Sequence, residues 1–186
     1  MFQKSMKPAK NIFLTGEINC GKSTMINSIL EEFNIEYTGF RTIPYKINDI
    51  HMGYAFKSLV KGMEETPPIS VKLKGMKPFK ITETFDYFGT LTLEESLKSK
   101  EKVILLDEIG IFESESSRFQ NIIRECLDSD KICFGVIKKK ENSFLNEIKS
   151  RDDVLLIELP KIELGKHAKI REEVSSFFKF LVNDNK

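Results

Sequence analysis

An apolar run, a glycine-containing turn and an amphipathic pattern follow one another near the start of the chain. Asn11–Thr15 is mostly apolar, GEINCGKS follows at positions 16–23, and apolar residues then recur at i, i+3, i+4 and i+7 from Ile26 to Phe33. This order predicts a strand, a tight loop and a helix. The loop fits the pattern G-x-x-x-x-G-K-[ST], which restricts the chain to folds in which a strand leads through such a loop into a helix.

The predicted loop has the chemistry of a phosphate-binding site. Its two glycines let the backbone curl so that successive N–H groups point inward, and the start of the helix adds the positive end of a dipole. Lys22 is expected to bridge the β- and γ-phosphates of a nucleoside triphosphate, Ser23 to coordinate the accompanying Mg²⁺, and Thr24 to meet the α-phosphate. The candidate nucleotide-binding residues are Gly16, Glu17, Ile18, Asn19, Cys20, Gly21, Lys22, Ser23 and Thr24.

A second candidate motif ends an apolar run further along the chain. Val103–Leu106 is too uniformly apolar for a half-exposed strand and predicts a buried parallel strand, which Asp107 and Glu108 follow. Because ligands bind at the carboxyl ends of parallel strands, both carboxylates are expected beside the phosphates. Asp107 is the candidate metal residue with Ser23, and Glu108 is the candidate base that accepts a proton from water. Lys22 and Glu108 are therefore the catalytic candidates.

The remaining patterns alternate strands with helices. Strands are predicted at 36–42, 54–59, 69–73, 132–137 and 154–159, and the middle of the chain is expected to form a β-rich hairpin. Helices are predicted at 91–100, with acidic residues in the first turn, and at 119–127, 144–149 and 170–182. The alternation predicts an α/β fold with a mostly parallel central sheet, helices on both faces and a β-hairpin excursion.

Length and charge exclude several classes of function. The chain has 186 residues, 40% of them hydrophobic, which fits one domain over 1–186 with residues 1–10 as a flexible leader. Its 29 basic and 28 acidic residues nearly cancel, so general attraction to nucleic acid is not expected. The basic segment Lys57–Lys80 is interpreted as a solvated hairpin face rather than a nucleic-acid contact.

The cysteines and the apolar segments bear on the compartment. The 3 cysteines show no C-x-x-C pair, which indicates a reducing compartment and argues against a zinc site. No stretch has the length and apolar character of a membrane span, and the basic start lacks the apolar core of a signal peptide. We expect a cytoplasmic monomer.

Three segments of the chain carry a family resemblance. NIFLTGEINCGKST at 11–24, GFRT at 39–42 and VILLDEIGIFE at 103–113 together resemble the THEP-type nucleoside-triphosphatases, over about residues 11–178. The resemblance implies a P-loop nucleoside-triphosphatase three-layer sandwich of the additional-strand, catalytic-glutamate class. It implies Mg²⁺-dependent hydrolysis of several nucleoside triphosphates to diphosphate and phosphate, with Asp107 as the metal acid, Glu108 as the base and Glu113 in a supporting role.

The chain departs from that family at two places. After GFRT the family shows an acid and then an arginine, whereas this chain has Ile43-Pro44-Tyr45-Lys46. The Asn-Arg pair that the family carries after the last strand is absent from 160–166. The candidates for a substitute cation are Arg118, Lys161, Lys166 and the run Lys138-Lys139-Lys140.

Two other functions share these motifs. A nucleotide or small-molecule kinase has the same scaffold and phosphate loop, but it must exclude the water that a second carboxylate favours. Its lid would come from the hairpin at 57–80. The third alternative is a slow nucleotide-dependent regulatory or binding protein, in which the γ-phosphate orders a switch segment.

Overall fold

The computed structural model describes residues 9–161 and 164–184 of the chain. Its centre is an eight-stranded sheet in the order β5-β4-β3-β2-β6-β7-β1-β8. The strands are β1 (Asn11–Gly16), β2 (Tyr37–Ile47), β3 (Ile50–Ser58), β4 (Pro68–Val71), β5 (Phe79–Lys80), β6 (Val103–Ile109), β7 (Ile132–Ile137) and β8 (Val154–Leu159). The helices are α1 (Lys22–Glu32), the π-helical η1 (Thr84–Gly89), α2 (Thr90–Lys98), the short η2 (Phe112–Glu115), α3 (Ser117–Asp128), α4 (Ser143–Lys149) and α5 (Leu164–Asp184).

The sheet has a parallel part and an antiparallel part. β2, β6, β7, β1 and β8 pair in parallel, whereas β3, β4 and β5 extend the sheet from β2 with antiparallel pairing. Strand β7 lies between β6 and β1, which is the additional strand that the family resemblance implies. The expected α/β class, mostly parallel sheet and β-hairpin excursion are confirmed.

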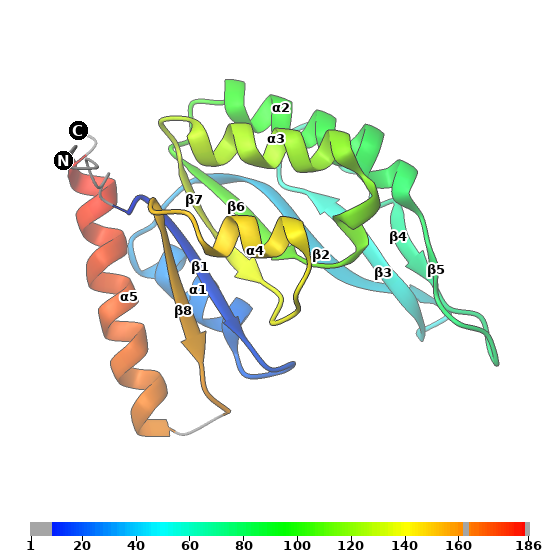
Figure 1. The fold of residues 1–186 in the computed structure, drawn as a ribbon, viewed down its shortest axis with the longest axis horizontal. Helices are drawn as coiled ribbons and strands as arrows, with labels where there is room; N and C mark the ends of the chain where they lie inside the picture. The colour runs from blue at the N-terminus through cyan, green and yellow to red at the C-terminus, as the bar shows by residue number, and fades with distance from the viewer. Residues whose placement is uncertain (1–8, 162–163, 185–186) are drawn as a thin grey trace.

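Helices cover both faces because the central strands are apolar on both sides. In β1, Phe13 packs with α2, α3 and α4, whereas its neighbours Ile12 and Leu14 pack with α1 and α5. Figure 1 shows α3 and α4 on one side of the sheet and α1 on the other. The three-layer arrangement that the sequence predicts is therefore present. Because helices cover both faces of the sheet, a ligand is expected at the ends of the strands, where the loops lie.

Several element boundaries differ from the sequence expectations. The helix expected at 91–100 is present as α2 (Thr90–Lys98). Its expected acidic first turn was wrong, because the first turn of α2 holds no acidic residue, and the π-helical η1, which leads directly into α2, was not expected. The apolar residues Phe85 and Phe88 of η1 pack into the core, so tertiary contacts extend the helix towards the amino terminus. β2 is longer than expected because its outer half pairs with β3 rather than with β6.

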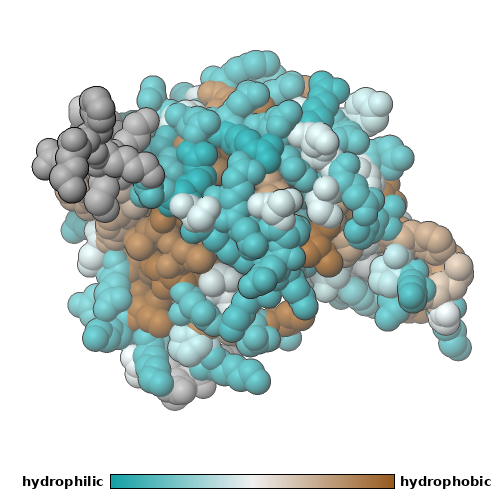
Figure 2. All heavy atoms as spheres, in the orientation of Figure 1, coloured by the Kyte–Doolittle hydropathy of each residue, from teal (hydrophilic) through white to brown (hydrophobic). Residues whose placement is uncertain are grey.

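The first described residues lie before β1, away from the carboxyl ends of the central strands, where a ligand is expected, and the edge strand β8 carries a hydrophobic patch. Of the leader expected over residues 1–10, positions 1–8 lie outside the described residues, and the Lys10 N–H bonds to the Asp153 carbonyl at 3.0 Å. Figure 2 shows a hydrophobic patch beside α5, over the edge strand β8, where Val154, Leu156 and Ile157 are partly buried. Within the described ranges, no helix combines the length and the apolar character needed to cross a membrane.

An aromatic cluster fixes β3 against the helical layer, and its loss should destabilise the fold. The Phe56 ring stacks on Phe40 at 4.6 Å and meets the rings of Phe85, Phe88 and Phe119 edge-on. Phe56→Ala should lower the free energy of unfolding by about 3–5 kcal/mol because it leaves a cavity in a fully buried site. Urea titration followed by circular dichroism measures the change. Phe180→Ala, at a side chain that is 56% exposed, is the control, and equal losses would contradict the expectation.

Candidate active site

The loop between β1 and α1 requires glycine at both ends. Gly16 has a φ of +140°, and a Cβ there would lie 2.5 Å from the Leu159 carbonyl oxygen of β8. Gly21, directly before α1, has a φ of +91°. Other residues adopt these values at a cost in strain, so the two glycines allow the loop to turn tightly at the start of the helix.

Two side chains of the loop point inward. Lys22 Nζ donates to the carbonyl oxygens of Gly16 at 3.1 Å and Glu17 at 2.7 Å, which closes the loop around the ammonium group. Cys20 is 2% exposed and belongs to the core between the sheet and α1, with its Sγ 3.7 Å from Lys22 Nζ. Cys20 thus anchors the loop from beneath.

The last part of β6 brings Asp107 to the first turn of α1. Ser23 Oγ donates to Asp107 Oδ1 at 3.0 Å, and Arg41 Nη1 of β2 lies 3.3 Å from Asp107 Oδ2. The other Arg41 nitrogen donates to Asn27 Oδ1 of α1 at 2.5 Å. Burial raises the pKa of the Asp107 carboxyl above its ordinary value, while the Ser23 hydrogen bond and the Arg41 charge act in the opposite direction.

Glu108 faces a different cation. Its Oε1 lies 2.8 Å from Nζ of Lys138, the first residue after β7. The Lys138 ammonium also lies 5.3 Å from the centre of the Phe112 ring. The two acids at the end of β6 therefore have separate partners, with Asp107 bound by Ser23 and Arg41 and Glu108 bound by Lys138.

Glu113 supports the turn that follows these acids. Its Oε2 accepts the backbone N–H of Gly110 at 3.0 Å, and its own carbonyl accepts a hydrogen bond from Gln120 Nε2 at 3.0 Å. The side chain is fully buried, and this burial raises the pKa of the Glu113 carboxyl to about 7. Glu113 lies behind the backbone of the site and fixes the segment after β6.

One cavity of about 550 Å³ joins these elements at the carboxyl ends of the parallel strands. It is lined by Gly16, Glu17, Ile18, Asn19, Gly21, Lys22, Ser23, Thr24, Thr42, Tyr54, Asp107, Glu108, Lys138, Lys139 and Lys140. All of the candidate loop residues except the buried Cys20 are in this set, and both candidate acids join them. The lysines at positions 22, 138, 139 and 140 make the lining basic, which suits a polyphosphate chain.

The candidate cations fall into two groups. Lys138, Lys139 and Lys140 line the cavity, and Lys139 Nζ is bound to Glu158 at 2.7 Å and lies 3.8 Å from Glu17. Arg118, Lys161 and Lys166 are absent from the lining that the described residues form. Part of the segment 160–166, where the family pair was missing, lies outside the described residues at 162–163.

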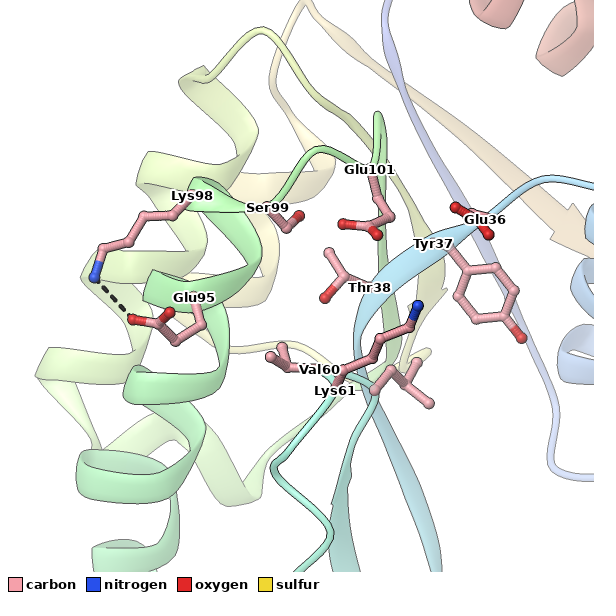
Figure 3. Close-up of a pocket in the computed structure, with 10 residues that line it drawn as sticks. Glu36, Tyr37, Thr38, Val60, Lys61, Glu95, Lys98, Ser99 and Glu101 are labelled. Carbon is pink, nitrogen blue, oxygen red and sulfur yellow. Dashed lines mark hydrogen bonds and ion pairs between the residues drawn. The ribbon is translucent and has the colours of Figure 1, made fainter.

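A second pocket lies at the opposite ends of the strands, where β2 and β6 begin. Figure 3 shows both acidic and basic side chains around it, among them Glu36, Lys61, Glu101 and the ion pair between Glu95 and Lys98. Its volume of about 440 Å³ is similar, but it has no glycine loop and no excess of cations. These features do not suit a triphosphate, so the cavity at the carboxyl ends of the parallel strands is the better candidate for a nucleotide site.

Sequence reasoning missed Arg41, Asn27 and Tyr54. Arg41 stood inside the GFRT segment, but its pairing with Asp107 depends on the register between β2 and β6. Asn27 is a half-buried polar residue of α1, and its hydrogen bond with Arg41 depends on where β2 lies relative to the helix. Tyr54 comes from β3, and no pattern in the chain connects that strand with the loop.

The fold and the cavity define the class: an α/β protein with a P-loop and a strand that delivers two acids beside it. Within that class, the chain belongs to the NTPase family, whose model matches residues 11–174. It is 29% identical over 150 residues to "Nucleoside-triphosphatase THEP1" of Thermotoga petrophila, covering 80% of this chain and 83% of that protein. The same-named protein of Sulfolobus acidocaldarius is 29% identical over 155 residues, with 80% and 90% covered. The expected family is confirmed.

Two solved structures share the fold. The crystal structure of THEP1 from Aquifex aeolicus superposes with a TM-score of 0.68 at 23% identity and covers 90% of this chain and 98% of that one. The solution structure of a human cancer-related nucleoside triphosphatase gives 0.67 at 20% identity and covers 90% and 96%. The parallel sheet with its hairpin extension is therefore a shared architecture.

Arg41 should contribute to stability through the buried carboxylate of Asp107. Arg41→Ala is expected to lower the free energy of unfolding by about 2 kcal/mol because it removes the cation that faces a buried acid. Urea titration at neutral pH measures the loss. The control is Arg171→Ala, whose ion pair with Glu32 at 2.7 Å is exposed and should cost less than about 1 kcal/mol. Similar losses in both variants would show that Arg41 has no special contact with Asp107.

Glu113 should make stability depend on pH. The unfolded chain releases its proton near the ordinary value of 4.5, whereas the folded state retains it up to about 7. The folded state therefore binds more protons in this interval, and stability falls as the pH rises through it, by roughly 3 kcal/mol. Glu113→Gln keeps an acceptor for the Gly110 N–H and should flatten the fall. Unfolding free energies of both proteins at pH 4.5 and pH 7 test this, and parallel pH dependences would contradict it.

Proposed function

We propose that this protein hydrolyses nucleoside 5'-triphosphates, ATP and GTP among them, to the diphosphate and phosphate in a Mg²⁺-dependent reaction. Membership of the NTPase family and the names of the THEP1 relatives support the class of reaction. The observation that carries the proposal is that residues of the glycine loop, Asp107 and Glu108 all line the same cavity. A phosphate chain, a metal residue and a base can meet there.

The loop is the binding element for the phosphates. The loop leads directly into the amino end of α1, whose free N–H groups and positive dipole end attract anions. Lys22 is held by two carbonyl oxygens of the loop, and its ammonium group is placed to exchange them for β- and γ-phosphate oxygens. This exchange would couple nucleotide binding to a change in the loop.

Ser23 and Asp107 fit the requirements of a Mg²⁺ site. A hydroxyl oxygen and a carboxylate oxygen are hard donors, they lie 3.0 Å apart, and both line the cavity. Arg41 holds the other carboxylate oxygen and so fixes the direction in which Asp107 Oδ1 points. A Mg²⁺ ion held by these residues would offset charge on the β- and γ-phosphates.

Glu108 is the proposed base. Lys138 engages its Oε1 at 2.8 Å, and the Glu108 side chain lines the cavity, where its second carboxylate oxygen can receive a water molecule. The water oxygen bonds to the γ-phosphorus, the bond between that phosphorus and the bridging oxygen breaks, and the diphosphate leaves with the electron pair. Glu108 accepts the proton of the water.

Phosphorus NMR of Mg-ATP and of Mg-GTP, incubated with the protein and no acceptor, tests the reaction directly. Wild type should release free phosphate and diphosphate. Glu108→Gln should slow release about 100-fold or more because it removes the base, and Lys22→Ala should do so by a similar factor because it removes a phosphate-binding charge.

Glu95→Gln is the matched control for Glu108→Gln, since Glu95 also pairs with a lysine at 2.8 Å but lies at the opposite edge of the sheet. It should leave the rate unchanged. Bound but intact nucleotide in the wild-type sample would contradict hydrolysis and favour the kinase or the regulatory protein.

A further inference from the structure

The position of Lys138 follows from the place of β7 in the sheet. β7 pairs with β6 on one side and with β1 on the other, so the residue after it lies between the acids of β6 and the glycine loop that follows β1. The Lys138 backbone N–H donates to the Ile109 carbonyl at 2.9 Å, which keeps the chain next to β6 for one residue beyond the strand. The side chain then enters the cavity.

Three contacts define where the Lys138 ammonium lies. It is 2.8 Å from Glu108 Oε1 and 5.3 Å from the centre of the Phe112 ring. Its stem lies over Gly110, where an added Cβ would approach Lys138 Cδ to 3.0 Å and Nζ to 3.4 Å. The absence of a side chain at Gly110 thus lets the lysine lie close to the backbone after β6, beside Glu108.

The Glu108–Lys138 pair is better sheltered than an ordinary surface pair. Its side chains are 26% and 29% exposed, whereas those of the Glu95–Lys98 pair are 41% and 69% exposed at the same distance. Among the other lysines of the cavity, Lys22 is bound by loop carbonyls and Lys139 by Glu158. Lys138 differs from both because its partner is the proposed base.

A γ-phosphate in the cavity would present a stronger set of acceptors than one carboxylate oxygen. An ammonium group has three N–H donors, so Lys138 can keep its bond to Glu108 and still donate to a phosphate oxygen. We propose that Lys138 is a further catalytic residue, which donates to an oxygen of the γ-phosphate and offsets the negative charge there during transfer to water. This inference rests on the proposed function, since it needs a triphosphate in the same cavity.

The proposal predicts that Lys138 contributes to the binding affinity for nucleoside triphosphates but not to the affinity for nucleoside diphosphates. A contact to the γ-phosphate is lost when the nucleotide has only two phosphates, whereas general attraction to anions acts on both. Lys138→Ala should therefore weaken binding of a non-hydrolysable ATP analogue by roughly 10- to 100-fold, which is the range expected for one charge-assisted hydrogen bond. Binding of ADP should change less than about twofold by the same reasoning.

The experiment is equilibrium binding of fluorescent AMP-PNP and fluorescent ADP, both with Mg²⁺, to wild type and variants. Lys138→Arg keeps the charge and should retain most of the preference for the triphosphate. Lys98→Ala is the matched control, because it removes a lysine with the same partner distance at the far edge of the sheet. It should leave both affinities unchanged.

The outcomes distinguish this proposal from the proposed function. An equal loss of both affinities in Lys138→Ala, or no loss, would overturn the role of Lys138 even if the wild type hydrolyses ATP. A selective loss for AMP-PNP supports it even if phosphorus NMR shows no turnover, because the binding measurement does not depend on hydrolysis. Lack of binding of either nucleotide by the wild type would overturn both proposals.

Discussion

The register of four parallel strands brings the site together. Val136 of β7 is the pairing partner of both Asp107 in β6 and Leu14 in β1, and Arg41 of β2 pairs with Asp107 from the other side. These residues therefore form one row across the sheet. The glycine loop begins two positions after Leu14, so it starts at the level of the acids, and the hydrogen bond between Ser23 and Asp107 follows from this geometry. A shift of one residue in the pairing of β6 with β7, or of β7 with β1, would separate the loop from Asp107.

Charges along this edge alternate, and burial explains why they must. Asp107 is buried with an arginine on one side and a hydroxyl on the other, and Glu108 has Lys138. A carboxylate removed from water without such a partner would be protonated or would destabilise the fold. The same pairs leave the cations close to the place where phosphates would bind. The arrangement that stabilises the buried Asp107 would thus also place cations beside a bound phosphate.

The local parts of the site could be predicted from sequence, and the long-range contacts could not. The loop lies within one short segment, and the strand before Asp107 is marked by its own apolar run, so both were identified from the residues alone. The partner of Arg41 depends on how β2 aligns with β6, which no pattern in the chain records. Likewise, three consecutive lysines look alike in sequence, and only the end of β7 makes Lys138 the partner of Glu108. The start of the helix before α2 was missed because packing of Phe85 and Phe88 decides it.

Strand β2 carries one of the two departures from the expected family pattern, in its outer half. β2 pairs with β6 only as far as Arg41, and from Thr42 onward it pairs with β3 alone. Thr42 and Tyr54 place this hairpin on one wall of the cavity, and Ile43-Pro44-Tyr45-Lys46 stands where the family shows an acid and an arginine. A cation missing from this wall must be supplied from another element if the γ-phosphate is to be neutralised. Strand β7 lies between the strand that leads into the loop and the strand that ends in the acids, and Lys138, the first residue after β7, contacts Glu108.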